Sequence, residues 1–169
     1  MIELSRSSSA LAIAVFLAAG SAGPGRAALK FHSTDRKLIA FVIPVGKQRG
    51  FEGSESQIDI RKGGKLLRSH DFASEDGDHG YGVDGAHWTP DSQFFVCRMR
   101  SSGGHSPMYA PVVFWSRRTN RFYQLKDFTA DQTISISAPD KLSVDTWPAV
   151  NPATVWLENI PSGKATELH

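Results

Sequence analysis

The sequence predicts an all-β protein. From Leu29 onward, apolar residues do not recur at the three- to four-residue spacing of an amphipathic helix, and short alternating or β-branched runs lie between clusters of turn-forming residues. A turn that contains an aspartate and leads into an apolar run occurs three times, at Asp35, Asp91 and Asp140. We therefore expect three consecutive copies of one β unit.

The first 27 residues are expected to form a signal peptide, and residues 28–169 a single β-repeat domain. Arg6 precedes an apolar stretch from Ala10 to Ala19, and small residues follow as far as Ala27. The apolar stretch is shorter than the roughly 20 residues that cross a bilayer, so no membrane span is expected in the mature chain. We expect cleavage after Ala27 and export to the periplasm or the cell exterior; cleavage after Ala22 and an uncleaved anchor are the alternatives.

Each copy is expected to contain four strands joined as a meander, and the last two strands of every copy are expected to form a hairpin. Gly63, Gly64 and Gly163 permit positive φ in these hairpins, while Pro90 and Pro139 preset φ in two of the aspartate turns. The expected strands are residues 28–32, 37–43, 57–61 and 66–72 in the first copy, 80–88, 92–99, 111–116 and 121–125 in the second, and 132–137, 141–147, 153–158 and 165–168 in the third.

A Pro-Asp turn before an apolar strand, followed by a hairpin with a Gly-Lys type turn, resembles the TolB-type β-propeller repeat. The residues that carry the resemblance run from Trp88 to Ser92 and from Ala138 to Asp140, whereas the first copy has Thr34 where proline is expected. The resemblance implies a propeller-like arrangement, which in that family mostly builds a binding platform.

Three propeller blades would leave the ring open, because propellers close with about four to eight blades and open sheet edges need cover. Two chains forming a homodimer could complete a ring of six blades. The strands could instead fold as a two-layer β-sandwich or as an irregular open β structure.

Charge and cysteine content exclude some classes of protein. Without residues 1–27 the chain carries 17 basic and 16 acidic side chains. This near-neutral balance does not indicate binding to nucleic acid or to an anionic membrane. Cys97 is the single cysteine, so no internal disulfide can form, and its place in an alternating apolar run predicts a buried side chain.

Strand direction places the candidate binding residues together. In an up-and-down meander, the link between copies and the loop after the second strand of each copy lie at the same end of the sheet. That end would gather residues 45–56, 73–80 and 101–110, which are polar and rich in glycine. Because carboxylates and imidazoles bind metal ions and polar ligands, we expect a site for one of these among Arg49, Glu75, Asp76, Asp78, His79 and His105.

The sequence contains no assembled catalytic motif. There is no G-x-S-x-G or S-x-x-K signature, and the histidines lack the short paired spacing of zinc sites. The stretch Asp76–Asp84 does not match the residue pattern of a calcium-binding loop. We therefore expect an exported, non-enzymatic interaction protein that binds a protein or a small polar ligand, and the sequence assigns it no cofactor. The alternative is a metal-assisted hydrolase that uses His79, His105, Asp76 and Asp78.

Overall fold

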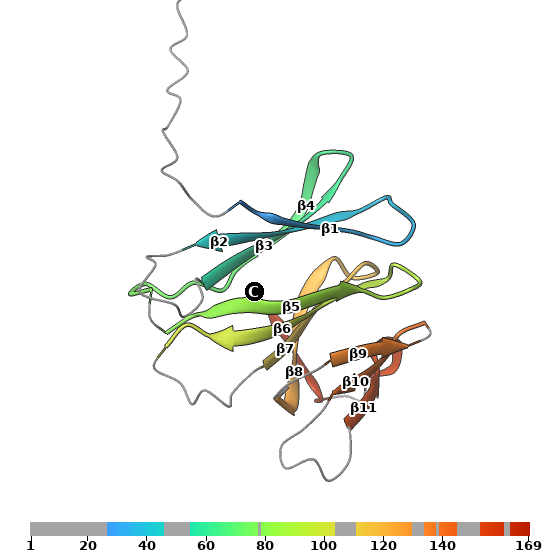
Figure 1. Ribbon diagram of the computed structural model, residues 1–169. Coiled ribbons are helices and arrows are strands. Elements are labelled where there is room, and N and C mark those ends of the chain that lie inside the picture. Colours follow the sequence, from blue (N-terminus) through green and yellow to red (C-terminus); the bar gives the residue numbers. More distant parts are fainter. Residues whose placement is uncertain are drawn as a thin grey trace, which may run out of the picture.

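The computed structural model describes residues 27–45, 55–77, 79–103, 111–129, 134–137, 139–144, 153–160 and 163–169. These residues form twelve antiparallel strands and one short 3-10 helix, so the predicted all-β class is confirmed (Figure 1). A strand is found at each expected place, and residues 132–133 and 145–147 of two expected strands lie outside the described residues. The expected signal peptide, apart from Ala27, lies outside the described residues. None of the helical structure described is long and apolar enough to cross a membrane.

The first sheet is a four-stranded meander in the order β1-β2-β3-β4 (Figure 1). Its strands are β1 (Leu29–His32), β2 (Ile39–Val45), β3 (Glu55–Lys62) and β4 (Lys65–Asp71). The β3–β4 hairpin turns through Gly63 and Gly64, whose φ values of 54° and 84° are the positive values that the sequence predicted.

The second sheet contains a meander of β5 (Tyr81–Trp88), β6 (Phe94–Ser101), β7 (Pro111–Ser116) and β8 (Arg121–Thr129). A fifth strand, β12 (Ala165–Leu168), pairs antiparallel with β8 along the sheet edge. The sequence placed residues 165–168 in a hairpin with residues 153–158, and this prediction is wrong.

The third sheet consequently has three strands, β9 (Ile134–Ser137), β10 (Lys141–Val144) and β11 (Ala153–Trp156), in the order β11-β10-β9. The 3-10 helix η1 (Leu157–Asn159) follows β11 directly, and the chain then crosses to β8. The sheets of four, five and three strands differ from the three equal units that the sequence predicted, and none of them closes on itself.

The second sheet lies at the centre and is buried on both faces. On β6, Phe95, Cys97 and Met99 pack into a cluster with the first sheet, whereas Phe94 and Val96 pack into a second cluster with the third sheet. This two-sided burial explains why residues 94–97 form a continuous apolar run. Cys97 is 1% exposed, as predicted, and its burial raises the pKa of the thiol.

The first aspartate turn is closed by a defined set of hydrogen bonds. Ser33 Oγ donates to Asp35 Oδ1 at 2.7 Å and accepts the Leu38 N–H at 3.0 Å, while Asp35 Oδ1 also accepts the Lys37 N–H at 3.1 Å. Arg36 takes a positive φ of 57°. The hydroxyl and the carboxylate therefore satisfy the turn's own backbone groups.

The second aspartate turn repeats this pattern atom for atom. Thr89 Oγ1 donates to Asp91 Oδ1 at 2.6 Å and accepts the Phe94 N–H at 3.0 Å, Asp91 Oδ1 accepts the Gln93 N–H at 3.0 Å, and Ser92 has a φ of 61°. The turns at residues 33–38 and 89–94 are thus equivalent backbone settings, which the spacing of the aspartates predicted.

Asp140 occupies a different setting. Its carboxylate accepts the Glu158 N–H at 2.8 Å and its carbonyl accepts the Leu157 N–H at 3.1 Å, so it anchors η1, and none of its contacts with described residues closes its own turn. The strand β10 begins at the next residue, Lys141, and the sequence has Ala138 in place of the hydroxyl residue of the first two copies. The expected equivalence of all three turns therefore does not extend to the third.

Candidate functional site

Three connections meet at one end of the first two sheets, and we call this region the loop end. It comprises the start of β3 at Glu55, the link between β4 and β5 through Ser74 and Gly80, and Ser102 just after β6. Ser102 N–H also donates to the Gly80 carbonyl at 3.0 Å. The structured bases of these connections therefore lie together, as strand direction predicted.

The side chain of Glu55 holds the loop end together. It is 1% exposed, and its Oε1 accepts hydrogen bonds from the Gly80 N–H at 2.6 Å and from the hydroxyls of Ser74 and Ser102 at 2.7 Å each. Its Oε2 accepts the Ser74 N–H at 2.8 Å. One carboxylate thus joins backbone and side-chain donors from two separate loops.

These contacts keep Glu55 ionised. Burial by itself would raise the pKa of its carboxyl, because a charged group is costly to remove from water. The hydrogen bonds from Ser74, Ser102 and Gly80 outweigh that effect and hold the pKa below the usual 4.5. Glu55 is therefore a buried, fully paired anion.

Gly80 is required by its position against this carboxylate. A Cβ at residue 80 would lie 2.5 Å from both Glu55 Oε1 and the carbonyl oxygen of Phe72. No real Cβ approaches oxygen so closely, and the Phe72 carbonyl is held by the Tyr81 N–H at 2.9 Å. Only glycine lets the link pass this close to Glu55.

Three of the predicted site residues lie on this link, and all three are exposed: Glu75, Asp76 and His79. The His79 ring nitrogen Nδ1 contacts the Asp76 carboxylate in an ion-pair geometry. Glu75 is adjacent in sequence and faces solvent. The structure thus brings Asp76 and His79 into contact, while Arg49, Asp78 and His105 lie outside the described residues.

Ser74 connects the exposed pair to the buried anion. Its Oγ lies 2.7 Å from Glu55 Oε1 and 2.9 Å from Asp76 Oδ1, and it accepts the backbone N–H groups of Gly77 and His79. A hydroxyl has a single hydrogen, so Ser74 donates to one carboxylate at a time. Because its hydroxyl hydrogen is donated to a carboxylate, Ser74 has a structural role: it holds the link in place.

Within the described parts of the chain, no group of three or more histidine, cysteine, aspartate or glutamate side chains is placed to hold a metal ion. Asp76 and His79 are two such side chains, and the other two members of the predicted set, Asp78 and His105, are not described. The described geometry therefore offers an acidic, hydrogen-bonding surface at the loop end.

Glu55, Ser74 and Ser102 were not among the residues that the sequence singled out. Glu55 lies at the end of a polar loop, immediately before a strand with alternating apolar residues. This position was a signal that the strand begins at Glu55 and that its side chain points inward. The serines gave no signal, because their partner is 19 residues away for Ser74 and 47 for Ser102.

Comparisons of this chain with family models, with curated proteins and with solved structures found no match.

Proposed function

We propose that this protein is an exported, non-enzymatic interaction protein that engages a partner protein or a small polar ligand through the loop end. The observation that carries the proposal is the buried Glu55 carboxylate, which ties two loops to the start of β3. Residues on a rigid base lose little conformational freedom on binding. The exposed Glu75, Asp76 and His79 lie between Ser74 and Gly80, the two positions at which Glu55 holds the link.

The charge of this surface indicates the kind of partner. Glu75 and Asp76 are acidic and exposed, and His79 is paired with Asp76. A ligand or protein surface with a positive charge would complement them, and such complementarity mainly governs association rate and specificity. We infer that the partner presents lysine, arginine or an amine.

Charge reversal at the loop end tests the proposal. The double variant Glu75→Lys with Asp76→Lys should reduce recovery of the partner about tenfold in affinity capture from the exported fraction, with partners identified by mass spectrometry. The matched control is Lys62→Glu with Lys65→Glu, which reverses two exposed charges on the β3–β4 hairpin at the opposite end of the first sheet. Equal recovery by the wild type and both variants would contradict a role for the loop end.

Metal analysis separates this proposal from the metal-assisted hydrolase. The interaction protein should contain substoichiometric zinc and calcium after purification, and adding either ion should leave its thermal transition unchanged. One bound ion per chain, lost together with a hydrolytic activity in Asp76→Asn, would favour the hydrolase instead.

We further propose that the sheets are blades of a TolB-like partial propeller and that a second copy of the chain completes the ring. The equivalent turns at Asp35 and Asp91 and the face-to-face packing of consecutive sheets support this arrangement. We also propose export from the cytoplasm, because the sequence of residues 1–27 has the pattern of a signal peptide. Sedimentation of a monomer at micromolar concentration would refute the ring.

A further inference from the structure

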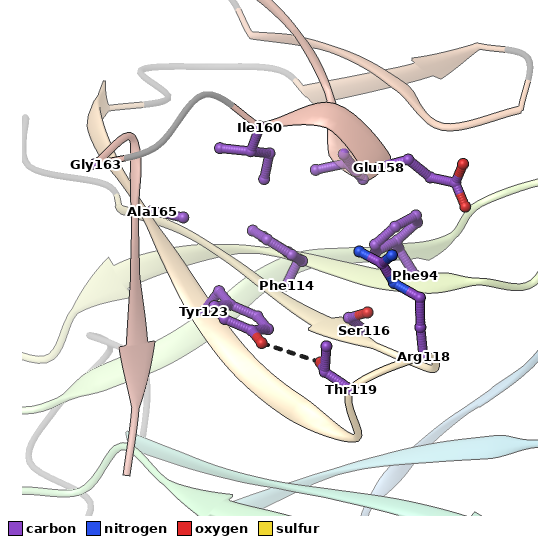
Figure 2. A pocket seen from close by; sticks show the side chains of 11 residues that line it. Phe94, Phe114, Ser116, Arg118, Thr119, Tyr123, Glu158, Ile160, Gly163 and Ala165 are labelled. Carbon is purple, nitrogen blue, oxygen red and sulfur yellow. Dashed lines mark hydrogen bonds between the residues drawn. The ribbon is translucent and has the colours of Figure 1, made fainter.

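A pocket of about 260 Å³ lies between the central sheet and the chain that leaves the third sheet (Figure 2). Its floor consists of Phe94, Phe114 and Tyr123, from β6, β7 and β8; Ala165, on the neighbouring strand β12, borders this floor, and Ile160 lies across from it. The pairing of β12 with β8 brings Gly163 and Ala165 to the border of the pocket.

Three aromatic side chains line the floor, of which Tyr123 is half-buried and Phe94 and Phe114 are 5% and 3% exposed. The rings of Phe114 and Tyr123 stack with centroids 5.2 Å apart and an interplanar angle of 19°, and Phe94 meets Phe114 edge to face at 5.9 Å. Aromatic surfaces of this kind pack against another planar ring in stacked or edge-to-face geometry. A volume of about 260 Å³ lies just below the range for drug-sized ligands and suits a ligand of one or two rings.

The rim carries two opposite charges at the same side of the pocket (Figure 2). Arg118 stands on the β7–β8 turn and Glu158 on η1, and both side chains are exposed. Within the described parts of the chain, neither forms an ion pair, so their charges are available to a ligand.

A serine hydroxyl also lines the pocket. Ser116 is 6% exposed and lines the pocket, and its Oγ makes no hydrogen bond within the described chain. Tyr123, by contrast, donates its hydroxyl to Thr119 Oγ1 at 3.1 Å. Ser116 Oγ is not among the unpaired side-chain atoms that are shut off from solvent, so water or a polar atom of a ligand in the pocket can pair with it.

We propose that this pocket binds a small aromatic zwitterion, of the class of an aromatic amino acid. The ring packs against Tyr123, the most exposed of the floor aromatics. The carboxylate faces Arg118, whose planar guanidinium matches carboxylate geometry, and the ammonium faces Glu158. This site lies at the end of the central sheet opposite to the loop end and is independent of the function proposed there.

Calorimetric titration of the purified protein with four probes tests the ligand class. L-tryptophan carries the ring and both charges, tryptamine lacks the carboxylate, 3-indolepropionate lacks the ammonium, and L-leucine lacks the ring. Tryptophan should bind about fivefold more tightly than tryptamine or 3-indolepropionate, since an exposed charge pair contributes up to about 1 kcal/mol. Leucine should not bind measurably.

Two variants assign the binding to the pocket. In Glu158→Gln, tryptophan should lose its advantage over 3-indolepropionate, and in Arg118→Gln it should lose its advantage over tryptamine. The matched control Lys62→Gln, at an exposed site on the β3–β4 hairpin, should keep both preferences. Thermal transitions of all variants should match the wild type, because the substituted side chains are exposed.

Three results would overturn the proposal. These are no binding of tryptophan up to millimolar concentration, binding of leucine as tight as that of tryptophan, or probe preferences that are unchanged in both pocket variants. The last result would place the ligand elsewhere on the protein.

Discussion

At the scale of single residues, Glu55 has the largest structural role in the loop end. A buried carboxylate is stable only when its lone pairs are satisfied, and here four donors from Ser74, Gly80 and Ser102 supply the hydrogen bonds. Because these donors come from two loops, the loss of the carboxylate affects both at once.

Glu55→Gln should destabilise the protein by about 2–3 kcal/mol. The amide keeps one acceptor oxygen but directs an NH₂ group at an N–H or hydroxyl donor, so a buried donor loses its partner. Urea denaturation followed by tryptophan fluorescence measures the change. Glu75→Gln, on the exposed part of the same region, is the control and should leave the midpoint unchanged; an equal loss in both variants would argue against the role of Glu55.

Gly80→Ala should cost about 1–3 kcal/mol, because the new Cβ would meet the Phe72 carbonyl oxygen and Glu55 Oε1 at 2.5 Å and the link would have to shift. Gly85→Ala, on the following strand β5, is the matched control, since a Cβ at residue 85 meets no atom of the described residues within 4 Å. Thermal unfolding of the two variants should differ clearly. A neutral Gly80→Ala would show that the link is not held against Glu55.

At the scale of elements, β12 decides the architecture of the third copy. It pairs Ala165 with Leu125 and Leu168 with Phe122, and in doing so it covers the outer edge of β8. Ala165 packs on the core cluster of the third sheet and Leu168 on that of the first. One four-residue strand therefore contacts both hydrophobic clusters.

Cysteine cross-linking distinguishes the observed pairing from the hairpin that the sequence suggested. In a Cys97→Ala background, Gln124→Cys with Thr166→Cys should form a disulfide on mild oxidation, because residues 124 and 166 are directly paired. Trp156→Cys with Glu167→Cys joins two residues that the expected hairpin would place opposite each other across its turn at residues 159–164, and this pair should remain reduced because residue 167 is paired with Tyr123. The reverse result, seen by mobility on a non-reducing gel, would restore the hairpin.

At the scale of the whole molecule, the central sheet holds the fold together by packing on both neighbours. The turns reinforce one of these interfaces: Asp35 N–H donates to Ser92 Oγ at 3.0 Å, Arg117 donates to Asp35 Oδ2 at 2.9 Å, and Trp88 Nε1 donates to the Phe31 carbonyl at 2.9 Å. Hydrogen bonds from Ser33 and Arg117 hold the pKa of Asp35 well below its usual range.

Global stability should fall in two stages as the pH is lowered. Burial in the interface between the first two sheets holds the pKa of His70 below 6.5, so the neutral ring stabilises the fold above that pH and the contribution is lost below it. The depressed pKa of Glu55 and of Asp35 adds a second loss below about 4.5, as these carboxylates take up protons on unfolding.

Urea denaturation between pH 8 and pH 3 measures this dependence. His70→Phe should remove the upper stage, and Glu55→Gln should make the lower stage shallower. A stability profile that stays flat from pH 7 to pH 3 in the wild type would contradict both assignments.

Much of the fold was predictable because its signals are local. Three kinds of signal act within a few residues: the apolar pattern of β6, the glycines of the β3–β4 hairpin, and the hydroxyl and aspartate of two turns. The strands lie where these signals predicted them. The meeting of the loops at one end followed from strand direction. Glu55, Ser74 and Ser102 could not be identified as a unit, because their contacts join distant parts of the chain.

The sequence by itself therefore determined the all-β class, the twelve strand positions and the matched turns at Asp35 and Asp91, since side-chain periodicity and turn chemistry are properties of short segments. Only the tertiary structure decided the partner of β12, the setting of Asp140 and the aromatic pocket. A four-residue strand carries too little pattern to select its neighbour. Its place is set by which edge and which apolar surface remain uncovered once the other sheets have packed.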